Sequence, residues 1–136
     1  MIEFTVPGMP RGKGRPRFGG GHAYTDNKTR DYEQLIRLCY QREAGTYDFP
    51  GAVCLAIRVV LPVPKSDSRR TRTDKLTGHI PPTRKPDVDN VAKVVMDALN
   101  GLAWADDKQV TQLSVAKFYG AEARTEVVVA DYGGRQ

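Results

Sequence analysis

Hydrophobic residues follow a strand-like pattern in four parts of the chain. Residues 2–6 alternate between bulky apolar and polar side chains, which predicts a short strand. Residues 52–63 are dense in β-branched and aliphatic side chains and predict a longer, buried strand. Two final strands are expected at about residues 109–119 and 125–131, joined by a turn.

Two other stretches have the spacing of an amphipathic helix. Apolar side chains recur every three or four positions between residues 29 and 44, and Gly45 is a plausible C-cap. A second helix is predicted to begin between Asp87 and Asp89 and to end at about Asn100, where an Asn-Gly pair stops it.

The remaining segments lack such periodicity. Residues 8–22 are rich in Gly, Pro and Arg and predict a mobile loop, and residues 65–85 predict a long loop without structure of its own. The order strand, helix, strand, helix, strand, strand indicates an α+β fold, with two main helices packed on a mixed sheet. At this length, residues 1–136 are expected to form a single domain.

Positive charge is concentrated in the two predicted loops. They hold 11 of the 21 basic residues but only 2 of the 16 acidic ones, so the rest of the chain is net negative. Such segregated charge favours a polyanion as partner, because each neutralised phosphate releases counterions. The expected DNA-binding residues in these segments are Arg11, Lys13, Arg15, Arg17, Arg69, Arg70, Arg72, Lys75, Arg84 and Lys85.

Other function classes find little support. No apolar run approaches the roughly 20 residues that span a bilayer, and the first residues lack the pattern of a signal peptide, so no membrane partner and a cytoplasmic location are expected. Two cysteines and two histidines, widely separated, do not suggest a zinc site or a nucleophile-histidine pair.

Acidic residues cluster around the second predicted helix. Asp87 and Asp89 precede it or begin it, and Asp106 and Asp107 follow it. Like charges brought together cost stability unless a cation neutralises them, and Mg²⁺ prefers carboxylate and water oxygens. Lys93, four residues after Asp89, would stabilise charge in the transition state. The pattern therefore favours a Mg²⁺-dependent nuclease.

Simpler roles for the same residues remain open. Asp87 or Asp89 is a suitable helix N-cap, Lys93 and Asp97 have the spacing of an exposed ion pair, and the Asp106-Asp107 pair suits a turn. Whether that pair returns beside the start or the end of the helix depends on the path of the next strand.

The segment resembles the signature of the RusA family of Holliday junction resolvases. The family pattern D-x-D-N-x-x-K, D-A-L, W-x-D-D is matched by Asp87-Val88-Asp89-Asn90, Lys93, Asp97-Ala98-Leu99 and Trp104-Ala105-Asp106-Asp107. The N-terminal sequences GRPRF and AYT are similar to those of phage and prophage members. One position differs: some members have Arg directly before the first Asp, where this chain has Pro86, and Arg84 or Lys85 is expected to substitute for it.

The resemblance implies a homodimeric crossover junction endodeoxyribonuclease that binds four-way DNA junctions and makes paired, symmetric nicks with Mg²⁺ or Mn²⁺. It implies that Asp87, Asp89 and Asp107 bind the metal, that Asp106 supports them, and that Lys93 is catalytic. Two alternatives stay open: a non-catalytic module that binds branched DNA, and a metal nuclease with a broader range, such as flaps, forks or RNA.

Overall fold

The fold is described from a computed structural model, which covers residues 1–14, 17–24 and 26–133. In chain order the elements are β1 (Ile2–Pro7), β2 (Arg17–Gly19), β3 (His22–Tyr24), α1 (Asn27–Ala44), β4 (Val53–Pro62), α2 (Arg69–Leu76), α3 (Val88–Leu99), the 3₁₀ helix η1 (Asp107–Gln109), β5 (Val110–Gly120) and β6 (Arg124–Asp131).

Four of the strands form one mixed sheet in the order β1-β6-β4-β5. β6 is antiparallel to both of its neighbours, whereas β4 and β5 run parallel. A parallel pair needs a long crossover, and here the chain between β4 and β5 carries both α2 and α3. β5 is therefore an edge strand that runs from the η1 end of the domain.

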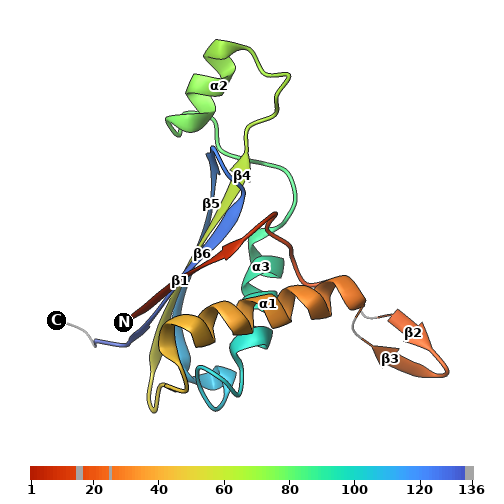
Figure 1. Ribbon diagram of the computed structural model, residues 1–136, viewed down its shortest axis with the longest axis vertical. Helices are drawn as coiled ribbons and strands as arrows, with labels where there is room; N and C mark the ends of the chain where they lie inside the picture. The colour runs from red at the N-terminus through yellow and green to blue at the C-terminus, as the bar shows by residue number, and fades with distance from the viewer. Residues whose placement is uncertain (15–16, 25, 134–136) are drawn as a thin grey trace.

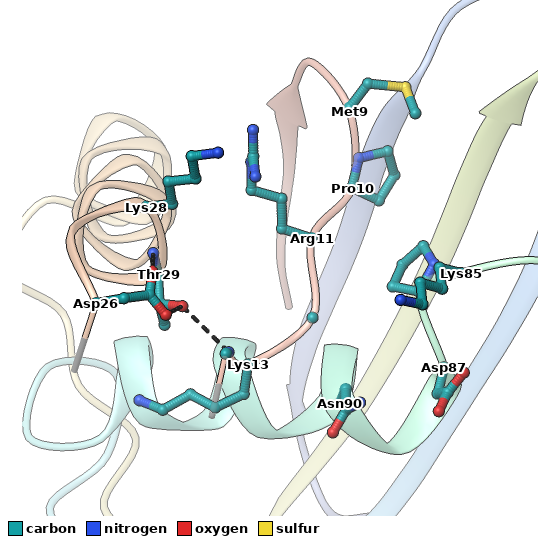
Figure 2. Close-up of a pocket in the computed structure, with 13 residues that line it drawn as sticks. Met9, Pro10, Arg11, Lys13, Asp26, Lys28, Thr29, Lys85, Asp87 and Asn90 are labelled. Carbon is teal, nitrogen blue, oxygen red and sulfur yellow. Dashed lines mark hydrogen bonds between the residues drawn. The ribbon is translucent and has the colours of Figure 1, made fainter. Parts of the chain in front are cut away.

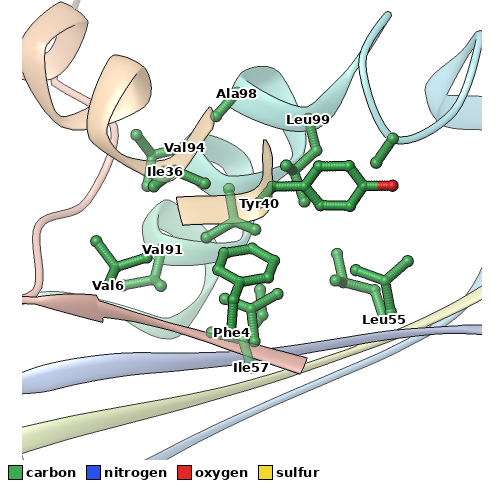
Figure 3. Packing of buried hydrophobic residues seen from close by; sticks show 14 of the residues in the cluster. Phe4, Val6, Ile36, Tyr40, Leu55, Ile57, Val91, Val94, Ala98 and Leu99 are labelled. Carbon is green, nitrogen blue, oxygen red and sulfur yellow. The ribbon is translucent and has the colours of Figure 1, made fainter. Parts of the chain in front are cut away.

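Helices α1 and α3 cover the same face of this sheet (Figure 1). Phe4 and Ile57 from the sheet meet Ile36 and Tyr40 of α1 and Val91 of α3 in the buried cluster (Figure 3). The pattern follows from sequence, because alternate strand residues and one stripe of each helix are apolar and must be buried together. The predicted α+β architecture, with two main helices on a mixed sheet, is confirmed.

Two predictions about loops are wrong. Residues 65–85 contain α2, which starts after the N-cap Ser68 and has no buried residue, so no apolar stripe announces it. Within residues 8–22 and just beyond them, β2 and β3 pair into a hairpin. Both elements project from the body, on different sides of it (Figure 1). Among the helices described, none is long and apolar enough to cross a membrane.

Candidate functional site

Two carboxylates stand at the start of α3. Asp87 occupies the N-cap position but makes no side-chain cap hydrogen bond, and Asp89 accepts a 2.9 Å bond from the backbone N–H of Asn90. Both side chains are exposed, and neither forms an ion pair with any residue in the described ranges. The carboxylate of Asp87 is thus available to a ligand.

A lysine on the edge strand holds the chain that leads into this site. Lys117 of β5 donates from Nζ to the carbonyl of Arg84 at 2.6 Å and to the carbonyl of Pro86 at 3.2 Å. Because the second carbonyl directly precedes Asp87, Lys117 fixes the path on which that carboxylate is presented. No local sequence pattern indicates this role, because the contact joins residues 31 positions apart.

The loop after β1 is fastened to both helices. Lys13 donates its backbone N–H to the carbonyl of Asn90 at 2.9 Å, and Gly14 donates to the hydroxyl of Thr29 at 3.1 Å. A Cβ on Gly12 would lie 2.7 Å from the Cβ of Asn90, closer than real Cβ contacts, so only glycine permits this approach. The loop therefore forms a fixed wall beside the start of α3.

The side chain of Lys13 joins α1 to α3. Its Nζ lies 3.0 Å from Asp97 and 3.3 Å from Glu33. Burial on its own lowers the pKa of Lys13, but hydrogen bonds to the two carboxylates outweigh it, and the net shift is upward. Lys93 lies 3.6 Å from Asp97 one turn away and remains largely exposed, as its spacing predicted.

A hollow of about 670 Å³ lies between this loop, the start of α1 and residues 85–90. Arg11, Lys28 and Lys85 line it together with Asp87 (Figure 2). Lys28 was not among the residues expected to bind DNA, because a single lysine at the start of a helix carries no distinctive pattern. The structure thus places basic residues from three separate segments around the hollow that Asp87 lines.

The second acidic pair follows the other end of α3. The chain reverses at Gly101 and returns to the buried Trp104, whose indole N–H donates to Asp107 Oδ1 at 2.9 Å. Asp106 caps η1 by accepting a 2.9 Å bond from the backbone N–H of Lys108. Both carboxylates therefore take part in local structural hydrogen bonds.

The three predicted metal ligands do not meet within one chain. α3 has 12 residues and rises about 1.5 Å per residue, so Asp87 and Asp107 lie near ends about 18 Å apart. Across residues 1–14, 17–24 and 26–133, no group of three or more His, Cys, Asp or Glu is placed to hold a metal ion. The reason is topological, since β5 starts where α3 ends.

The basic residues of α2 divide into two kinds. Arg69 and Arg70 are exposed, and within the described part of the chain their side chains form no hydrogen bond or ion pair. Arg72 donates to a backbone carbonyl at 3.4 Å, and Lys75 forms a 2.7 Å ion pair with Asp67. The first two are therefore free to contact DNA, whereas the other two hold α2 in place.

The remaining predicted DNA-binding residues lie at the base of α2 and in the N-terminal segment. Arg84 donates to the carbonyl of Pro62 at 3.2 Å. Arg84 and Lys85 were the two candidates to replace the arginine that some family members have at the position of Pro86, and Lys85 is the one that lines the hollow. Arg15 and the side chain of Arg17 lie outside the described residues.

Comparison with known proteins agrees with these features. Residues 7–130 match the family described as Endodeoxyribonuclease RusA, which is nearly the whole chain. The chain is also 38% identical over 136 residues to the uncharacterized protein YqaN of Bacillus subtilis (strain 168), covering 96% of each chain. Both the extent of the family match and the level of identity are decisive: this chain belongs to the RusA family of endodeoxyribonucleases.

Proposed function

We propose that this chain is a Mg²⁺-dependent endonuclease that acts as a homodimer and resolves four-way DNA junctions by paired, symmetric nicks. The observation that carries the proposal is the pair of exposed carboxylates, Asp87 and Asp89, beside a hollow whose lining includes four basic residues. In a protein that only binds DNA, these acids would weaken the affinity because they repel the phosphates. Hydrolysis of a phosphodiester, by contrast, requires both a site for a polyanion and a site for a cation.

The donor set suits a hard divalent cation. Asp87 has a carboxylate with no cap hydrogen bond, and Asp89 uses one oxygen for a backbone N–H and retains the other. Carboxylate oxygens are the ligands that Mg²⁺ takes while keeping positions for water and phosphate. When bound, such an ion lowers the pKa of a coordinated water and neutralises charge on the phosphate. Lys93 is exposed on the same helix, and its positive charge would stabilise the negative charge that develops on the phosphate in the transition state.

A third carboxylate must come from elsewhere. Since Asp107 lies at the opposite end of α3 from Asp87, we propose that Asp107 of one chain completes the site begun by Asp87 and Asp89 of the other. A two-fold dimer supplies two such sites, as two symmetric nicks require. Each site would then exist only in the assembled dimer.

The direct test is nicking of a synthetic four-way junction with Mg²⁺. We expect wild-type protein to nick two opposing strands, EDTA to abolish nicking, and Asp87→Asn to lower the rate more than roughly 100-fold, because loss of a ligand costs more than loss of its supporting hydrogen bond. Asp131→Asn, an exposed acid at the end of β6, is the matched control and should cut like wild type. Equal cutting by both variants would refute the proposed role of Asp87.

The hydrogen bonds of Asp106 and Asp107 favour one alternative, a module that binds branched DNA without cutting it. In that case the acids serve only to cap helices. Asp89→Asn then leaves DNA affinity unchanged or improves it, and calorimetry detects no Mg²⁺ binding. Comparing junction, flap, fork, duplex and RNA at one salt concentration separates junction selectivity from a broader nuclease.

A further inference from the structure

Basic residues outnumber acidic ones around the hollow beside Asp87, since four cations line it together with two acids, Asp26 and Asp87. Arg11, Lys28 and Lys85 come from three segments, and within the described ranges none of their side chains forms an ion pair. Asp31 lines a smaller adjoining hollow of about 240 Å³ with Arg11 and Lys28, but no ion pair joins it to either. Among the residues that the structure describes, no carboxylate pairs with these three cations, in contrast to Lys13.

Their arrangement suits an anion that lies between them. The side chains of Lys28 and Arg11 extend toward one another, whereas Lys85 lies near Asp87 on the other side of the loop that carries Arg11 (Figure 2). Like charges that face one another repel unless an anion neutralises them. A guanidinium and an ammonium together match a phosphate, the first through paired N–H donors and the second as a point charge.

We propose that this hollow holds a backbone phosphate that flanks the cut phosphate on the same DNA strand, with Lys28 and Arg11 as its ligands. The inference rests on the proposed function and specifies the substrate contact made by that same site. The position follows from Asp87, which borders the same hollow, so a strand that presents a bond to Asp87 continues along the hollow towards Arg11 and Lys28.

The fixed elements around the hollow make the phosphate contact selective for one position along the DNA strand. The loop that carries Arg11 is fastened to α3 through Lys13 and to α1 through Gly14. Lys28 lies in the first turn of α1, just after the N-cap Asp26. The two cations are thus held on fixed elements at a fixed separation from the start of α3, so they select one phosphate along the strand rather than any phosphate.

The first experiment compares Lys28→Gln with Arg37→Gln. Arg37 is exposed and lies nine residues, or about two and a half turns, further along α1, which places it on the opposite side of the helix. Junction binding is measured with Ca²⁺ in place of Mg²⁺ at several salt concentrations. We expect Lys28→Gln to weaken binding roughly two- to fivefold and to reduce the salt slope by about 0.9. Arg37→Gln should change neither, and equal effects of the two variants would overturn the inference.

The second experiment locates the phosphate. Single neutral methylphosphonates are placed at each position flanking the cut bond, and binding is measured for wild type and Lys28→Gln. At one of these positions the neutral linkage should weaken binding by wild type more than binding by Lys28→Gln, because the variant has already lost one of the two contacts to that phosphate. Additive losses at every position would overturn the inference. If wild type neither binds nor cuts junctions, the proposed function fails; if it cuts but the variants show no coupling, only this inference fails.

Discussion

Lysine side chains with the same chemistry have different roles in this chain, depending on what surrounds them. Lys13 is largely buried between Glu33 and Asp97 and joins two helices, whereas Lys28 lines the hollow without an ion pair in the described part of the chain. The pKa of Lys13 is raised, so its stabilising contribution is fully present at neutral pH and is lost only as the pH rises above the ordinary value of 10.5. The ion pairs through which Lys13 holds the loop after β1 are therefore present throughout the neutral pH range.

Lys117 gives a prediction at this scale. Lys117→Met removes the donor to the carbonyls of Arg84 and Pro86, so Asp87 is presented less uniformly, and we expect Mn²⁺ affinity to fall about tenfold. Calorimetric titration with Mn²⁺ and the Mg²⁺ concentration for half-maximal nicking measure the effect. Lys65→Met, at an exposed lysine between β4 and α2, is the control.

Restoration of metal affinity in Lys117→Arg would support positioning, because the guanidinium can donate to the same carbonyls. A fall in melting temperature with metal affinity unchanged would show that Lys117 only stabilises the fold.

At the scale of elements, α2 forms where no helix was expected. It has eight residues and buries none of them, and so short a helix is marginal alone. Its contacts to the body compensate: Lys75 pairs with Asp67 and lies 4.9 Å from the centre of the Tyr119 ring, and Ser68 caps its first turn. These contacts leave Arg69 and Arg70 exposed on a projecting arm (Figure 1).

We predict that this arm contributes affinity rather than chemistry. The double substitution Arg69→Gln and Arg70→Gln should weaken binding to all branched DNA and reduce the salt slope by about 1.8, while Mn²⁺ affinity stays unchanged. Filter binding across a salt series measures the slope. The control is Arg37→Gln with Arg42→Gln, which removes the same charge from exposed positions of α1. If both double variants lower affinity equally, the arm has no particular role.

At the scale of the whole molecule, one chain is incomplete as a catalyst under the proposed mechanism. The start of α3 carries two acids, and the acid that would complete their site lies beyond its other end. The two projections, α2 with its exposed Arg69 and Arg70 and the β2–β3 hairpin, leave the body on different sides (Figure 1). Two chains would present four such projections to a branched substrate.

Mixing inactive chains tests whether the site is shared. We expect Asp87→Asn and Asp107→Asn homodimers each to be inactive, and their mixed dimer to regain activity, because one of its two sites combines both native acids. A nicking assay after refolding the chains together gives the answer, and one nick per junction rather than two is the expected product. No recovery from a mixture shown to contain mixed dimers would mean that the acids act within one chain or not at all.

The sequence by itself determined the secondary elements of the core and the identity of the acids. The stripe of α3, the alternation in β1 and the dense apolar run of β4 are local patterns, and burying them together requires helices on one face of a sheet. Local chemistry also predicted that Lys93 and Asp97 pair, since residues four apart on a helix are neighbours.

Only the tertiary structure decided which charges meet. Lys117 reaches Pro86 across 31 residues, and Lys28 joins Arg11 and Lys85 around one hollow, because the sheet order and the crossover bring these segments together. The same topology sends Asp107 to the far end of α3. A one-dimensional pattern records which residues are charged, but the distance between two charges depends on the path of the chain between them, and that path is set by the packing of the whole core.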